Sequence, residues 1–372
     1  MHLAVLANDQ NSFIRTIGDG LARMARACGA TADVHGDGLN ALTVPLTIDF
    51  ASPRSALGSS GRLAKNRRLF DRFVEKVAGA SVIVVVAHVP ISFARGFLRN
   101  IEALRTRLPK IPIVNYAHYY LPTVDKWGHA VLRGIRADLT AQDLLSLRQG
   151  TFGMGRYDWY LVASVVSEIP VIRGPQPYSL IGVDIDDGSL YPDQNGELRA
   201  LVDFAQTRKN YPQFRGTQIE ALERTGTPYR VLEGKFTISE IREFYRRTGI
   251  LFLAHRESFG LPICEVQACG GLVFAPHEEW AGAHWIKDDL RTPGPGRLSP
   301  NFVIYDDDVE RLVEQIEVAK ASFDPARVVR TFREVHPHLY NGDREALGAF
   351  LNKVEDGTIH SGSHLRYEQI GR

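Results

Sequence analysis

The stretch ESFGLPICE, residues 257 to 265, decides the fold. It follows GILFLA (249–254), an apolar run with the length and composition of a buried strand. It continues into VQACGG (266–271), where a helical pattern ends in glycines. The stretch therefore predicts a junction from strand to turn to helix, with the carboxylates of Glu257 and Glu265 on either side of the turn.

The predicted turn has the chemistry of an anion site. Pro262 suits the first turn of a helix, where its missing N–H is not needed, and Gly260 allows the backbone to approach a ligand closely. Free amides and the positive end of the helix dipole bind phosphate, whereas carboxylates accept hydrogen bonds from hydroxyls. A diphosphate with sugar hydroxyls on both sides satisfies all three features, so we expect a nucleotide sugar. The dipole alone favours an acidic residue by about 0.3 to 1 kcal/mol, which explains Glu265 better than it explains Glu257.

Strand-like apolar runs alternate with helical patterns along the whole chain. The expected strands are 2–7, 81–87, 111–117, 159–164, 198–204, 228–234, 250–254 and 272–276, and the expected helices are 13–28, 62–78, 94–107, 214–225, 238–248, 263–269, 307–321 and 343–353. This alternation predicts an α/β fold in which helices cover parallel sheets.

Prolines and glycines between 170 and 196 indicate a domain boundary. We expect residues 1–170 to form an amino-terminal, acceptor-side Rossmann-like domain. Residues 171–355 would form a carboxyl-terminal Rossmann-like domain that binds the nucleotide sugar, and residues 356–372 a polar tail. The prediction is two doubly wound domains facing a central cleft, with ligands at the carboxyl ends of the strands.

Composition and charge narrow the class of protein. The 372 residues, 44% of them hydrophobic, are enough for two domains. No signal peptide or membrane-spanning run is present in the sequence, so we expect a soluble, cytoplasmic protein. The net charge of +1 conceals an asymmetry: residues 1–165 hold 20 basic and 12 acidic side chains, and the remainder holds 24 and 31. A basic half indicates an anionic partner, or attraction between the two halves.

Two longer segments resemble a known family. REFYRRTGILFLAHRESFGLPICEVQACGGLVFAP (242–276) resembles the E-x7-E region of retaining glycosyltransferases of family 4, which have the GT-B fold. SLIGVDIDDGSLYP (179–192) is similar to the interdomain segment of that family, and IPIVNYAHYY (111–120) looks like its amino-domain strand that ends in a functional histidine. The resemblance covers the second half of the chain, and the first half by strand order only.

The resemblance implies roles for individual residues. Glu265 would bind the ribose and Glu257 the donor sugar. His118 would touch the donor sugar and the reacting phosphate. Apart from the resemblance, the position of His88 at the end of the strand-like run VVVAH makes it a candidate for the acceptor side. The donor diphosphate would be bound by Lys209, by Ser258 and by the backbone amides of Phe259, Gly260 and Leu261.

The sequence departs from the family at the arginine that normally accompanies Lys209, because Phe204 stands there. Arg208 or Arg215 is the expected substitute. A histidine after a strand is also commonly a packed or surface residue, which is the alternative for His118 and His88. A further group, His277, Glu278, Glu279 and His284, has metal-ligating side chains, but its setting is that of a solvated turn. We expect no metal and no cofactor besides the donor substrate.

The implied reaction is metal-independent transfer of a hexosyl-like group from a nucleoside diphosphate sugar with retention of anomeric configuration. The basic segments 52–73 and 94–110, with Arg67 and Arg68, would contact an anionic acceptor or form an ordinary solvated surface. A lipid-linked or surface-glycan acceptor is our first hypothesis, with peripheral membrane association. A DNA glycosyltransferase acting on a hydroxylated base is the second. A GT-B protein that binds a nucleotide sugar without transferring it is the third.

Overall fold

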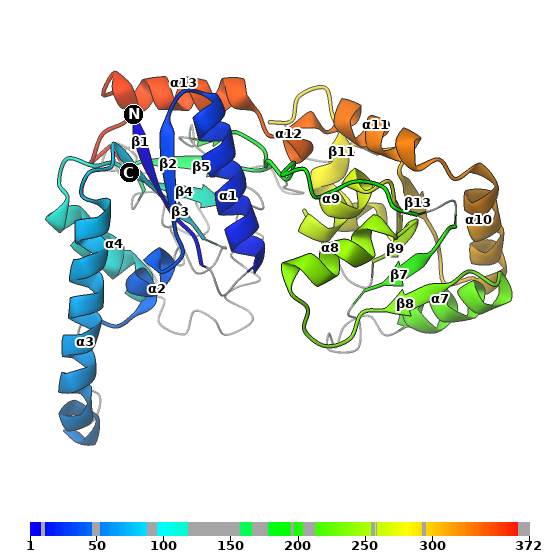
Figure 1. Ribbon diagram of the computed structural model, residues 1–372, viewed down its shortest axis with the longest axis horizontal. Coiled ribbons are helices and arrows are strands. Elements are labelled where there is room, and N and C mark those ends of the chain that lie inside the picture. Colours follow the sequence, from blue (N-terminus) through cyan, green and yellow to red (C-terminus); the bar gives the residue numbers. More distant parts are fainter. Residues whose placement is uncertain are drawn as a thin grey trace. The chain divides into compact units, whose positions relative to one another are not determined.

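The computed structural model describes residues 1–8, 12–46, 53–87, 95–117, 157–165, 178–194, 197–203, 213–253, 257, 259–291 and 295–363 (Figure 1). The chain divides into two compact units. Unit 1 contains residues 1–163, 169–183 and 343–372, and unit 2 contains 164–168 and 184–342.

Unit 1 is built on a parallel sheet with the strand order β2-β1-β3-β4-β5-β6. Its strands are β1 His2–Leu6, β2 Thr31–His35, β3 Val82–Val86, β4 Ile113–Ala117, β5 Trp159–Val162 and β6 Tyr178–Leu180. Its helices are α1 Ser12–Ala27, α2 Gly38–Thr43, α3 Pro53–Val77, α4 Arg95–Arg107 and α13 Arg344–Glu355. The order reverses between β1 and β3, as in a doubly wound fold.

Fully buried central strands define the core of this sheet. Every residue of β3, sequence VIVVV, is buried, and so is every residue of β4. β-branched side chains pack well on a pleated surface that is covered on both faces, so the continuous apolar run becomes an inner strand of a parallel sheet. In register, Leu3 of β1 pairs with Ala32 on one side and with Val82 on the other.

Unit 2 is a second parallel sheet, with the order β13-β10-β9-β7-β8. Its strands are β7 Ala200–Val202, β8 Tyr229–Val231, β9 Ile250–Phe252, β10 Leu272–Ala275 and β13 Phe302–Ile304, with a separate antiparallel pair of β11 Trp285–Ile286 and β12 Arg297–Leu298. The helices are α7 Gln213–Arg224, α8 Ile238–Arg246, α9 Leu261–Ala268, the 3₁₀ helix η4 Glu278–His284, α10 Val309–Ser322, α11 Pro325–Val335 and α12 Pro337–Tyr340. The order reverses between β7 and β9.

The two reversals mark where ligands bind in sheets of this type, outside the carboxyl ends of the adjacent strands. In unit 2 the chain leaves β9 toward Glu257 and leaves β7 at Asp203. In unit 1 the chain leaves β3 toward His88 and β4 toward His118, although these two histidines lie outside the described residues.

All eight strands expected from the sequence are present, with shorter bounds. The sequence did not predict β2, β6, β11, β12 and β13, which are short or carry polar residues, or the helices α2, α11, α12 and η4. Helix α3 begins at Pro53 rather than at residue 62, because serines and glycines weaken the helical pattern of its first turns without preventing a helix.

The division into units differs from the expected boundaries. Strand β6 pairs with β5, and α13 packs against α1 and β6, so both belong to unit 1. The expected polar tail is also part of unit 1 where it is described, since Ile359 and Ser363 are buried and the amide of Gly362 donates to Asp158 over 3.0 Å. An apolar stripe identifies a helix from sequence but does not say which core it covers.

Among the described residues, no helix combines the length and apolar character that crossing a membrane requires.

Candidate functional site

The start of α9 carries the predicted turn. Gly260 is the N-cap residue, with φ 60° and ψ 95°, and its carbonyl accepts the first bond of the helix, from the amide of Cys264 at 3.2 Å. Pro262 lies in the first helical turn, as expected. The strand, turn and helix predicted from ESFGLPICE are confirmed.

Only glycine fits at position 260. A Cβ there would lie 2.7 Å from Cγ of Glu257 and 2.7 Å from Cδ1 of Ile263, in a left-handed backbone conformation that side chains rarely adopt. The side chain of Glu257 therefore lies directly against the turn. Its backbone is anchored as well, because its amide donates to the carbonyl of Trp280 at 3.1 Å.

The turn presents backbone donors that the described part of the chain leaves without acceptors. The amides of Gly260, Leu261 and Ile263 make no hydrogen bond among the described residues, and Pro262 has no N–H. These donors lie at the positive end of the α9 dipole. The arrangement suits an anionic group that approaches the glycine closely.

A buried histidine contacts the backbone of the turn. Nε2 of His284 lies 2.8 Å from the carbonyl oxygen of Phe259, and both residues are fully buried. A carbonyl only accepts, so Nε2 carries the proton, and Nδ1 faces Nε2 of Gln267 at 3.4 Å. Burial, followed by the neighbouring His336, lowers the pKa of His284 to about 3, which keeps the ring neutral.

Glu265 lies one turn into α9 and is buried against an arginine of α8. Arg242 donates from Nε to Oε1 of Glu265 at 2.9 Å, and Nη2 lies 2.8 Å from the same oxygen. Nη1 of Arg242 lies 2.5 Å from Asp187 and 2.9 Å from the hydroxyl of Ser189. Arg242 thus joins the two segments, 242–276 and 179–192, that the sequence analysis had singled out separately.

The Arg242 contact leaves half of the carboxylate available. Oε2 of Glu265 accepts no hydrogen bond within the described part of the chain. Burial raises the pKa of Glu265 to about 6, while Arg242 acts in the opposite direction. Near neutral pH the group is an oriented anion with one accepting oxygen.

The carboxyl end of β7 adds a cation beside this region. Arg215 of α7 donates from Nη2 to the carbonyl of Asp203, directly after β7. Its buried Nε has no hydrogen-bond partner among the described residues. Phe204 stands where the family has an arginine, and Arg215 is the candidate substitute whose position the structure describes. Arg208 and Lys209 lie outside the described residues.

Other predicted residues divide between the units. Ser258 also lies outside the described residues, as do His88 and His118. The structure brings Glu257, Phe259, Gly260, Leu261 and Glu265 together around the start of α9. Arg67 and Arg68 are exposed on α3 of unit 1.

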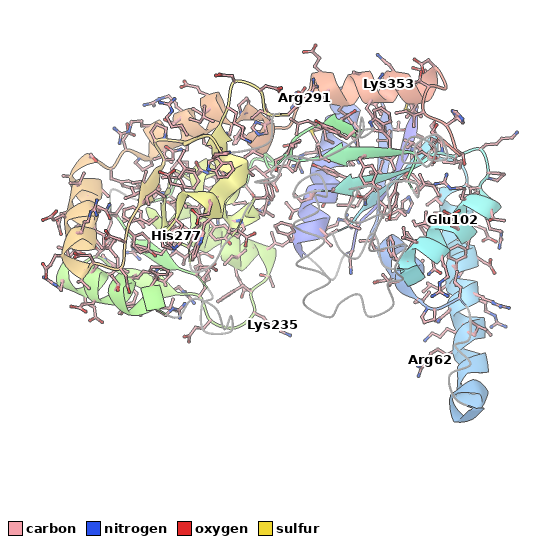
Figure 2. The ribbon with its side chains drawn as sticks, turned by 180° about the vertical axis from the view of Figure 1, so that it is seen from behind. Arg62, Glu102, Lys235, His277, Arg291 and Lys353 are labelled. Atoms are coloured by element: carbon pink, nitrogen blue, oxygen red, sulfur yellow. The ribbon has the colours of Figure 1, made fainter. Side chains whose placement is uncertain are left out.

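The expectation that residues 277–284 form a solvated turn is wrong for His284. His277, labelled in Figure 2, is exposed, with its ring 5.8 Å from that of Phe214 and 5.5 Å from that of Trp280. His284 is instead fully buried, because its neighbours Ala283 and Trp285 are apolar and carry it into the core. No group of three metal-ligating side chains with suitable geometry occurs among the described residues.

The roles of two residues of the site were not predicted: Arg242 was not singled out, and His284 was assigned to a solvated turn. Arg242 stood in a quoted segment, but its partner is 23 positions away and only the packing of α8 on α9 brings them together. His284 had a readable signal, since it is flanked by apolar residues on both sides in WAGAHWI (280–286).

Comparisons with known proteins identify the fold. No family model and no curated protein sequence matches the chain. Among solved structures, an alpha-glucosyltransferase in complex with UDP and a 13-mer DNA containing an HMU base is similar, with a TM-score of 0.54, 13% identity and coverage of 95% of this chain and 99% of that one. A putative UDP-N-acetylglucosamine 2-epimerase from Listeria monocytogenes gives a TM-score of 0.52, 10% identity and coverage of 96% of each chain. Trehalose-6-phosphate synthase OtsA gives a TM-score of 0.50 and 11% identity, and the match covers 95% of this chain and 99% of that one.

The chain has the α/β fold of GT-B glycosyltransferases. Its two parallel sheets are Rossmann-like and doubly wound, as expected from the sequence. Identities of 10 to 13% establish the fold alone. Because an epimerase is among the similar structures, the chemistry has to be argued from the site.

Proposed function

We propose that the protein is a retaining glycosyltransferase that uses a nucleoside diphosphate sugar as donor. The observation that carries this proposal is the start of α9, where unpaired amides lie between Glu257 and Glu265 at the carboxyl end of β9. Amides suit a diphosphate, and the carboxylates suit the hydroxyls of the groups attached to it.

In this proposal each part of the donor has its own contacts. The diphosphate binds the amides of Gly260, Leu261 and Ile263. The ribose hydroxyls donate to Oε2 of Glu265, while Arg242 holds Oε1. The transferred sugar lies toward Glu257, whose side chain abuts the turn.

The proposed reaction is a same-face displacement. The bond between the anomeric carbon and the phosphate oxygen breaks, a bond to the acceptor oxygen forms on the same face, and the acceptor proton passes to the departing phosphate. Negative charge then grows on the diphosphate. The α9 amides, with Lys209 and with Arg208 or Arg215, would stabilise that charge without reorganising. His118 would contact the sugar and the phosphate in the reacting complex.

The acceptor is less constrained than the donor. The first hypothesis from the sequence, a lipid-linked or surface-glycan hydroxyl, needs a membrane-facing surface or a glycan groove. The second, a hydroxylated base in DNA, needs a surface for phosphates. The charged surface of α3 bears on this choice.

A second candidate function is binding of a nucleotide sugar without transfer. Phe204 at the family arginine position favours it, because a site with fewer cations stabilises the departing diphosphate less. This candidate predicts donor binding with neither transfer nor hydrolysis.

A donor screen tests the proposal. The protein is melted with UDP-, GDP-, ADP- and dTDP-sugars, and a donor at a hundred times its Kd should raise the free energy of unfolding by about 2.7 kcal/mol. Slow donor hydrolysis is then followed by NMR, in which retention appears as release of the sugar with the anomeric configuration of the donor. Inversion would contradict the mechanism, and binding without any turnover would favour the second candidate.

A further inference from the structure

Helix α3 of unit 1 carries cationic side chains that no carboxylate neutralises in the part of the chain that the structure describes. Among the described residues, Arg62, Lys65, Arg67 and Arg68 take part in no ion pair and no side-chain hydrogen bond. The two other basic residues near the carboxyl-terminal end differ: Lys76 lies 2.7 Å from Asp37, and Arg72 donates to the carbonyl of Arg68.

The sequence around these cations contains no compensating charge. From residue 50 to residue 70 the chain has five basic residues and no acidic one. The first acidic residue that follows, Asp71, is already occupied by Arg107 at 2.7 Å. In unit 2 the exposed Arg199, Arg224 and Arg311 contrast with these cations, because each lies within 2.7 Å of a carboxylate.

Helical spacing gathers the cations on one face. Arg62, Lys65, Arg68 and Arg72 follow one another at intervals of three and four residues. They span about 15 Å, the axial length of four to five base pairs of duplex. The carboxyl-terminal half of α3 packs into unit 1 through apolar side chains, with Phe70, Phe73, Val74 and Val77 at most 5% exposed.

The amino-terminal part of α3 extends away from the sheet of unit 1 (Figure 1). Arg62 is labelled on this extending part in Figure 2. An extended helix of about 10–12 Å diameter, with exposed cations along one side, can lie along a groove or a backbone of phosphates.

An anionic membrane fits this surface less well. Membrane-bound helices need an apolar face that is free to enter the interface, but the large apolar side chains of α3 from residue 61 onward are buried or half-buried. Among the described residues, the large hydrophobic side chains that are exposed are Tyr191, Tyr229 and Val318, and all three belong to unit 2. Among the side chains that the structure describes, the basic face of α3 therefore lacks a large exposed apolar residue of the kind that accompanies lipid binding.

We propose that the basic face of α3, formed by Arg62, Lys65, Arg68 and Arg72, binds the phosphate backbone of a nucleic acid that carries the acceptor hydroxyl. That the nucleic acid is an acceptor rests on the proposed transferase function. The binding surface does not, because it follows from charge and geometry in unit 1. The guanidinium groups suit the surface, since each can donate two parallel hydrogen bonds to a phosphate.

Binding is measured by fluorescence anisotropy of the full chain with a labelled 20-base-pair duplex and a labelled single strand, at several salt concentrations. Co-sedimentation with phosphatidylcholine vesicles, with and without phosphatidylglycerol, provides the membrane arm. The test variant is Arg62→Gln/Lys65→Gln/Arg68→Gln. Its matched control, Arg199→Gln/Arg311→Gln/Lys320→Gln, makes the same charge change in exposed pairs of unit 2, which stabilise the fold little.

We expect salt-sensitive binding of nucleic acid that the α3 variant weakens by about tenfold or more, while the control variant binds as the wild type does. The slope of log affinity against log salt should decrease by about 2 to 3, near 0.9 for each lost phosphate contact. Equal nucleic-acid binding by the wild type and the α3 variant would overturn the proposal that the basic face of α3 binds nucleic acid. Binding to anionic vesicles without binding to nucleic acid would overturn it in favour of a membrane.

Titration of the same proteins with the nucleotide sugar found in the donor screen separates the two proposals. Loss of nucleic-acid binding with normal donor binding assigns α3 to the acceptor side. If the α3 surface binds nucleic acid but no donor is bound or turned over, the surface stands and the transferase function fails. If donors are turned over while nucleic-acid binding does not depend on α3, the transferase function is supported and the proposed role of α3 is wrong.

Discussion

Arg242 lies across one oxygen of Glu265: its Nε and Nη2 are 2.9 and 2.8 Å from Oε1, and Oε2 makes no hydrogen bond among the described residues. Both side chains are at least nine-tenths buried. A buried carboxylate that is held on one side by a fixed guanidinium keeps its charge and its direction. Arg242 is thus a positioning residue for the proposed ribose contact.

Replacing Arg242 should change the pH dependence of donor binding. Burial raises the pKa of Glu265 to about 6 and Arg242 opposes that rise, so Arg242→Gln should raise the pKa further. Because the proposed contact needs the carboxylate, wild-type affinity should fall as the pH drops through about 6, and this midpoint should move upward in the variant. Calorimetric titrations from pH 5 to 8 measure the shift. Arg242→Lys, which keeps the charge, should lie between the two, and identical profiles for all three proteins would remove Arg242 from this role.

Glu265→Gln should raise the KM for the donor and leave kcat nearly unchanged. The substitution preserves the shape of the side chain, whereas alanine would also strand the buried Arg242. Loss of a hydrogen bond to a charged group costs about 1.5 to 3 kcal/mol, which corresponds to a roughly tenfold to hundredfold rise in KM. The ribose is remote from the reacting carbon, so turnover at saturation should persist. Initial rates over a range of donor concentrations give KM and kcat separately. A normal KM with a reduced kcat would place Glu265 at the reacting centre.

Unit 2 should lose stability in mild acid because of a buried histidine cluster. The rings of His284 and His338 lie 5.6 and 5.9 Å from that of His336, and burial, the largest cause in each case, lowers the three pKa values to about 3, 3 and 4 respectively. A histidine with a depressed folded pKa stabilises the fold above its unfolded value of 6.5, and that contribution is lost as the pH falls toward the folded pKa. For His336 alone the loss at pH 5 is about 2 kcal/mol.

His336→Phe tests the histidine cluster, because both ring nitrogens of His336 are buried and have no hydrogen-bond partner among the described residues. Relative to the wild type, the variant should gain about 2 kcal/mol more at pH 5 than at pH 7.5. Urea unfolding is followed by tryptophan fluorescence, to which Trp280 and Trp285 of unit 2 contribute. The exposed His277→Gln serves as control and should follow the wild type. An equal difference at both pH values would show that His336 does not titrate on unfolding.

His118→Ala tests the role taken from the family resemblance. If the imidazole stabilises the reacting sugar and phosphate, nucleotide should bind almost normally while transfer falls by roughly 10² or more. If His118 is instead a packing residue, the variant should melt earlier and its folded fraction should turn over normally. Melting temperature and kcat measured on one preparation distinguish these outcomes.

The sequence predicted the secondary-structure elements well, but it predicted contacts between residues distant in the sequence poorly. Runs such as VIVVV (82–86) identify buried strands, and Gly260 with Pro262 identifies the start of α9, because these signals are local. The Arg242–Glu265 pair depends on how α8 packs against α9, and no periodicity encodes that contact. The return of α13 to unit 1 was missed for the same reason, since the buried stripe of Leu347 and Phe350 fits any apolar surface.

The central claim, that the start of α9 binds the donor diphosphate, is tested most directly at Gly260. A Cβ at this position meets Glu257 and Ile263 at 2.7 Å, so Gly260→Ala should displace the amides. The control is Gly216→Ala in α7, where a Cβ meets nothing within 4 Å and the helix should gain about 0.5 to 1 kcal/mol. The measurement is calorimetric titration with the nucleoside diphosphate of the donor that the screen identifies. We predict normal binding by the wild type and Gly216→Ala and at least a tenfold loss in a folded Gly260→Ala; equal affinity in all three proteins would contradict the account.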